Sequence, residues 1–166
     1  ILEATRAPNN IIFLYEKELR ETFNKRNNIF TIDEVFLEAD LLSTGLAYRL
    51  NVHKFKPNGL EKLFNLFKNY LEPMARTAGI ITGDENSLNA DLKLAALVFT
   101  LSATQKSDGQ KGISFASSDR TLTDFVYMNA ESVRTNGHPK DFPEFLQTRI
   151  RTYNFIQGKA KFLRYD

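Results

Sequence analysis

The stretch from about Leu88 to Leu101 restricts the possible folds of this chain more than any other segment. It is long enough for a helix, and it is apolar on nearly every side. Its apolar residues include Leu92, Leu94, Ala95, Ala96, Leu97, Val98 and Phe99. A helix that is hydrophobic all round must be buried, because none of its faces suits water. We therefore predict that this helix lies inside the protein and that other elements cover it.

Helical patterns alternate with short strand patterns along the rest of the chain. Apolar residues at helical spacing predict helices over residues 9–24, 33–45, 59–76 and 142–154, and a further helix that opens at Ser118 or Asp119. Short apolar β patterns predict strands over residues 29–32, 113–116 and 160–165. Such alternation favours an α/β fold, here a three-layer α/β/α sandwich with a mostly parallel central sheet. In folds of this class the ligand site lies beyond the carboxyl ends of the strands.

Length and composition narrow the class of protein. The 166 residues suit a single domain that spans residues 1–166. The chain has no Cys, which excludes disulfides, thiol catalysis and Cys-based zinc sites. Because 22 Lys and Arg stand against 20 Asp and Glu, any attraction to nucleic acid depends on clustering of the basic residues. No apolar run has the length of a membrane span and none resembles a signal peptide, so we expect a cytoplasmic (intracellular) protein.

Asp91 is an acid near the start of the apolar helix. An ionised carboxylate on so apolar a surface is costly unless an opposite charge compensates it. A divalent metal ion, an Arg or a helix N-terminus can supply that charge. Two interpretations stay open: Asp91 is a metal ligand, or it only favours the helix dipole from the first turn.

Asp119 follows the predicted strand of residues 113–116, at the strand end where α/β sites collect. Its ordinary interpretation is the N-cap of the next helix, a position for which Ser118 competes. The pair of Asp91 and Asp119 is more informative than either acid. Carboxylates that converge at strand ends form an oxygen-ligand site suited to Mg²⁺ or Mn²⁺.

Two segments resemble the third and fourth acidic motifs of PIN domains, a family of metal-dependent ribonucleases. One is Ala90-Asp91-Leu92-Lys93-Leu94-Ala95-Ala96, an Asp that heads an Ala-rich helix. The other is Phe115-Ala116-Ser117-Ser118-Asp119-Arg120-Thr121-Leu122, a strand that ends in Ser-x-Asp-x-x-Leu. Upstream, residues 29–38 resemble the strand and helix that deliver the Glu of the family. Glu38 is the better match there, with Glu34 one turn earlier as the substitute.

The resemblance covers roughly residues 29–126 and departs from the family at one position. The first Asp of the family, which ends its first strand, has no counterpart in this sequence. Ile1-Leu2-Glu3 resembles the residues that follow that Asp, and no Met precedes them. We expect the first strand and its Asp to lie upstream; a degenerate member without nuclease activity is the alternative. Residues 131–166 are either part of the PIN-like domain or a family-specific extension.

The resemblance implies an endoribonuclease that hydrolyses RNA phosphodiester bonds with Mg²⁺ or Mn²⁺. Asp91, Asp119 and Glu38 would be its catalytic and metal-binding residues. Binding of the substrate would need a hydroxyl near the site and basic groups for the phosphates. The residues that match these needs are Ser117, Arg149, Arg151 and Lys161.

Two other functions stay open at the level of the sequence. One is a catalytically inactive PIN-like module that binds RNA or protein. The other is an unrelated α/β interaction domain in which the acids are ordinary caps. As partners we expect RNA, and a protein partner or further domains of a larger chain, but no membrane.

Overall fold

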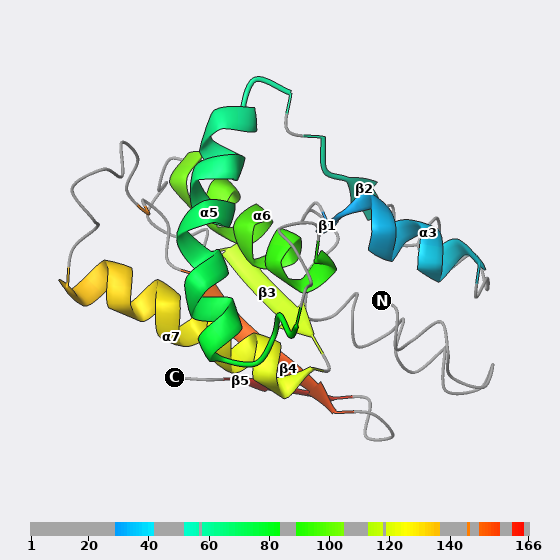
Figure 1. Cartoon of the computed structure of the whole chain (residues 1–166). Coiled ribbons are helices and arrows are strands. Elements are labelled where there is room, and N and C mark those ends of the chain that lie inside the picture. The colour runs from blue at the N-terminus through cyan, green and yellow to red at the C-terminus, as the bar shows by residue number, and fades with distance from the viewer. Residues whose placement is uncertain are drawn as a thin grey trace. The chain divides into compact units, whose positions relative to one another are not determined.

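Helices and short strands alternate along the computed structural model of the chain (Figure 1). The structure describes residues 29–41, 52–56, 58–83, 89–104, 113–117, 119–136, 146, 150–156 and 161–164. The chain divides into two units, one of residues 1–56 and 155–162 and one of residues 57–154 and 163–166. The described residues are mostly helical, and the expected mixture of helices with parallel strands is present among them. The assignment of residues 1–166 to a single domain stays a prediction.

The described part of residues 1–56 contains a parallel pair of strands and one helix. Strands β1 (Ile29–Thr31) and β2 (Val52–Lys54) pair in parallel. Helix α3 (Asp33–Leu41) starts two residues after β1, and the residues buried at this junction are Ile32 and Phe36. The strand and helix expected over residues 29–41 are confirmed. β2 was not predicted, because three residues are too few to display an alternating pattern.

The first helix of the second unit, α5 (Glu61–Thr77), is amphipathic, as expected for residues 59–76. Its buried residues recur every four positions and are Phe67, Leu71 and Ala75. Pro73 lies inside the helix, close to its end. The helix stops before Gly79, whose φ of 75° is the left-handed conformation that glycine adopts without a steric penalty. One apolar face of α5 is therefore available to pack against another element.

Helix α6 (Ala90–Thr104) is the buried helix that the sequence predicts. It packs against α5, against strand β3 (Ile113–Ser117) and against helix α7 (Arg120–Asn136). The rings of Phe67 in α5 and Phe99 in α6 meet edge to face, with their centroids 5.6 Å apart. Leu92, Ala95, Ala96, Leu97, Val98, Phe99, Thr100, Ser102 and Ala103 are the buried residues of α6. Because elements cover α6 from several directions, an apolar surface all round is what its position requires.

A β-α-β crossover follows α6. β3 leads through α7 into strand β4 (Ile150–Ile156), and β3 and β4 pair in parallel. Strand β5 (Lys161–Arg164) lies on the other side of β4, so the order in this sheet is β3-β4-β5. The strands expected over residues 113–116 and 160–165 and the helix expected after Asp119 are confirmed.

The helix predicted over residues 142–154 is wrong where the structure describes it. Leu146 is buried outside any regular element, and the residues from Ile150 onward form β4. Ile150, Thr152 and Asn154 are the buried residues of this strand. Arg151 between them is exposed, which is the period of two that a strand with one buried face produces. Pairing with β3 and the β-branched side chains of Ile150 and Thr152 favour a strand here.

Some predicted segments lie outside the described residues. They are the helix predicted over residues 9–24, the last part (residues 42–45) of the helix predicted over residues 33–45, and the segment 142–145. Among the helices that the structure does describe, none combines the length and the apolar character needed to cross a membrane.

Candidate functional site

Three of the site residues that the sequence predicts lie at one end of the second unit. β3 and β4 are parallel, so their carboxyl ends lie side by side. α7 starts immediately beyond β3, and the N-terminal end of α6 lies on the same side of the unit (Figure 1). Asp91, Ser117 and Asp119 lie at these element ends, and Asn154 of β4 is the register partner of Ser117; we call these four residues the strand-end site. This is the side of an α/β unit where ligands bind.

Asp91 is the second residue of α6, and its side chain is partly buried. The N-cap of this helix is Asn89, whose Oδ1 accepts the N–H of Asp91 at 2.9 Å and that of Leu92 at 3.1 Å. The carboxylate of Asp91 is therefore not the cap. Its place in the first turn is compatible with both interpretations of Asp91, a metal ligand and a partner of the helix dipole. Asn89 escaped the sequence reasoning, although Asn before an apolar run is a favoured N-cap.

Asp119 is the N-cap of α7, and its side chain is exposed. Oδ1 accepts the N–H of Leu122 at 3.1 Å, and the carbonyl of Asp119 accepts the N–H of Thr123 at 3.0 Å. Ser118, the competing cap, lies outside the described residues. A carboxylate offers about four acceptor positions, so one capping hydrogen bond does not exhaust it. The capping role of Asp119 therefore leaves room for a ligand role.

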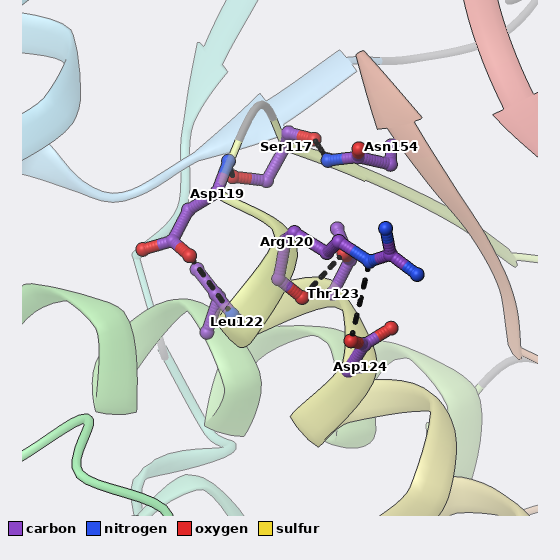
Figure 2. Close-up of polar contacts among 7 residues, drawn as sticks. All are labelled: Ser117, Asp119, Arg120, Leu122, Thr123, Asp124 and Asn154. Atoms are coloured by element: carbon purple, nitrogen blue, oxygen red, sulfur yellow. Dashed lines mark hydrogen bonds and ion pairs between the residues drawn. The ribbon is translucent and has the colours of Figure 1, made fainter. Parts of the chain in front are cut away.

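A chain of hydrogen bonds holds the turn that presents Asp119 (Figure 2). Nδ2 of Asn154 donates to the carbonyl oxygen of Ser117 at 3.0 Å, and Oγ of Ser117 accepts the N–H of Asp119 at 3.1 Å. Ser117 and Asn154 are also the last partners in the register of β3 with β4. Asn154 was missed because the sequence reasoning placed it in a helix. A strand assignment would have put this Asn at the carboxyl end of β4.

The basic side chain next to Asp119 in the sequence, that of Arg120, does not occupy the Asp119 carboxylate. The side chain of Arg120 points away from it, and Nε of Arg120 lies 3.7 Å from Oδ2 of Asp124 (Figure 2). Within the described part of the chain, no basic side chain forms an ion pair with Asp119. An exposed carboxylate is the donor that Mg²⁺ and Mn²⁺ prefer, so Asp119 fits such an ion in kind, and Asp91 offers the same donor. No three acidic or His side chains of the described residues form a group that could hold a metal ion.

Three of the expected site residues have no described position at the strand-end site. Glu38 belongs to α3 in the first unit, and its side chain is outside the described part of the structure. Arg149 lies outside the described residues. Lys161 begins β5, but its side chain is not described either. The roles proposed for these three residues stay predictions.

Arg151 is described, and the register keeps it away from Ser117. It pairs with Ser114, three positions before the last pair of β3 and β4. Because side chains alternate along a strand, Arg151 also faces the opposite side of the sheet from Asn154. Its side chain is exposed. The contact of Arg151 with an RNA phosphate stays a prediction.

Comparison of the chain with protein-family models, with curated protein sequences and with solved structures gave no match. The chemistry of the strand-end site and the motif resemblance are therefore the basis for assigning a function. Of the residues that carry the resemblance, Asp91, Ser117 and Asp119 lie in one unit and at one end of it.

Proposed function

We propose that this protein is a metal-dependent endoribonuclease of the PIN type, which hydrolyses phosphodiester bonds in RNA. One observation carries the proposal. Asp119, an exposed carboxylate, lies two residues beyond the carboxyl end of β3, on the same side of the unit as the head of α6 with Asp91. Both acids stand where the resemblance to PIN domains assigns metal ligands.

The proposed roles of the residues follow from their chemistry. Asp91, Asp119 and Glu38 would hold Mg²⁺ or Mn²⁺ through carboxylate oxygens. A bound divalent ion lowers the pKa of its water and neutralises charge on a phosphate. Oδ1 of Asp119 remains engaged with the N–H of Leu122, which fixes the direction of the carboxylate. The N-terminus of α7 adds partial positive charge beside the site, where an RNA phosphate would lie.

The proposal extends to the fold and the surroundings of the protein. As the fold we propose the α/β/α sandwich of PIN domains, with a mostly parallel central sheet; the parallel pairing of β3 with β4 through α7 supports this. Arg149 and Lys161 would contact RNA phosphates outside the acidic centre. We further propose that the protein acts in the cytoplasm and that a protein partner or further domains accompany it.

Cleavage of a mixed-sequence single-stranded RNA tests this function. The protein is incubated with the RNA and Mn²⁺ or Mg²⁺, and EDTA is the control for metal dependence. The informative variant is D119N, because Asn is as good an N-cap as Asp and the helix start is preserved. We expect D119N and D91N each to lower the cleavage rate at least about 100-fold, more than is typical for loss of a residue that only supports a ligand.

The matched control is D124N. Asp124 lies in the same helix as Asp119, but its carboxylate pairs with Arg120 on the outside of α7. We expect D124N to cleave at the rate of the unchanged protein. Equal cleavage by D119N, D91N and D124N would reject the proposed site.

A non-catalytic module that binds RNA or protein is the second candidate. The observation that favours it is the count of acids, because the described part of the second unit places two carboxylates and not three at the strand-end site. Binding of the RNA without cleavage, with no dependence on Mn²⁺, would select this function instead.

A further inference from the structure

The strand-end site contains a residue that the motif resemblance does not assign. Asn154 ends the register of β4 with β3, and only 8% of it is exposed. Its side-chain amide donates to the carbonyl oxygen of Ser117, 37 positions earlier in the sequence. A nearly buried amide that reaches across two strands restrains the carbonyl that it binds, because breaking the hydrogen bond costs free energy.

The hydrogen bonds continue from Ser117 to the start of α7. Oγ of Ser117 accepts the N–H of Asp119 at 3.1 Å, and Oδ1 of Asp119 accepts the N–H of Leu122 at 3.1 Å. Figure 2 shows these contacts as a path from Asn154 through the turn to the first turn of the helix. The side chain of Asp119 is exposed, so solvent does not hold it in one direction. The capping hydrogen bond to Leu122 and the hydrogen bonds from Asn154 through Ser117 together supply the restraint.

We propose that Asn154 is a positioning residue, whose amide sets the conformation of the Ser117–Asp119 turn and through it the direction of the Asp119 carboxylate. The value of this restraint for catalysis rests on the proposed function, while the restraint itself does not. Asn154 touches neither metal nor RNA in this proposal and acts through Ser117. A carboxylate that is free to rotate gives the site a lower affinity for a metal ion, because binding of the ion must then order the side chain.

The test replaces Asn154 by its isostere in N154D, which keeps the shape of the side chain and removes the N–H donor. Amide hydrogen exchange is measured by NMR, and Mn²⁺ binding by calorimetry. We expect the amides of Asp119 and Leu122 to exchange roughly tenfold faster, as loss of one hydrogen bond predicts. Amides in the last two turns of α7 should not change. The dissociation constant for Mn²⁺ should rise several-fold.

The matched control is N129D. Asn129 is also partly buried, and its Nδ2 donates to the carbonyl of Phe125 at 2.8 Å, within α7 and away from the turn. This variant should leave exchange at Asp119 and the Mn²⁺ affinity unchanged. A second variant, N154S, removes the reach of the amide without placing a charge in a nearly buried position. If N154D does not fold, N154S replaces it in the test, and the same local increase in amide exchange is expected.

The outcomes separate this inference from the proposed function. Unchanged exchange at Asp119 and Leu122 in the Asn154 variants would overturn the positioning role, as would an increase spread evenly over β3 and α7. Faster local exchange with unaltered Mn²⁺ affinity would also overturn it. If the unchanged protein binds no Mn²⁺, the proposed function fails by itself, and the exchange pattern still decides whether Asn154 fixes the turn.

Discussion

Helices α6 and α7 begin in the same way at the strand-end site, and they differ in which residue is the cap. In each helix the cap accepts the N–H of a buried Leu three positions later, Leu92 for Asn89 and Leu122 for Asp119, in both cases at 3.1 Å. In α6 the cap is neutral, and the acid Asp91 lies two residues beyond it. In α7 the acid itself is the cap. An acid at a helix N-terminus can thus be separate from the capping function or combined with it.

This difference has a consequence for reading sequences. A capping acid has a structural reason to be present, so its identity says little about function by itself. Asp91 has no capping role, since Asn89 fills that position. The two interpretations that the sequence leaves open for Asp91, a partner of the helix dipole and a metal ligand, do not involve capping. The presence of Asp91 is therefore the stronger indication of a function. For Asp119, a test of function needs variants that preserve the helix cap.

The largest effects should come from the buried Leu residues that follow the two caps. L92A and L122A each remove a side chain that is at most 1% exposed. We expect each to lower the free energy of unfolding by about 2–5 kcal/mol, since a cavity remains in the core. Urea unfolding followed by circular dichroism measures this. A loss below about 1 kcal/mol in one variant only would show that the two helix starts are not packed alike.

Removing the caps should have an intermediate effect. N89A and D119A are each expected to cost about 0.5–2 kcal/mol of unfolding free energy, because an N–H in the first turn loses its acceptor. The exchanges N89D and D119N should cost much less, because Asp and Asn are comparable caps. The same urea titrations apply. If D119N destabilised the protein as much as D119A does, the charge of Asp119 and not its capping geometry would stabilise α7.

The smallest effect should come from the ion pair on the outside of α7. Nε of Arg120 and Oδ2 of Asp124 are 3.7 Å apart, and both side chains are well exposed, at 77% and 44%. Exposed pairs of this kind contribute about 0–1 kcal/mol. We expect D124N to change the unfolding free energy by less than about 0.5 kcal/mol, with the change shrinking further in 0.5 M NaCl. A larger loss would mean that this face of α7 is not simply solvated.

The elements of the second unit differ in how well the sequence predicted them. α6 was predictable because its apolar residues surround the helix, a pattern that only burial explains. β3 and the start of α7 were predictable because Asp119 directly follows a short apolar run. β4 was not predictable, because the apolar residues around Ile150 and Tyr153 fit both a helical repeat and the alternation of a strand. Pairing with β3 determines that the segment forms a strand.

The strand-end site shows a similar division. Asp91, Ser117 and Asp119 were found because they belong to short local motifs. The contact of Asn154 with Ser117 joins residues 37 positions apart, and it depends on the register of two strands. Local spacing contains no information about that register. The same register faces Arg151 to the opposite side of the sheet from Asn154, and local spacing could not show this either.

The most direct test of the strand-end site is the change in melting temperature that Mn²⁺ causes. The unchanged protein, D91N, D119N, the double variant and D124N are melted with EDTA and with Mn²⁺ at about 100 times the dissociation constant of the unchanged protein. A ligand at that excess stabilises the folded state by about 2.7 kcal/mol, so Tm should rise by several degrees. The rise should persist in D124N, shrink in each single variant and vanish in the double variant. The same rise in the double variant, or none in the unchanged protein, would contradict the assignment of Asp91 and Asp119 as metal ligands.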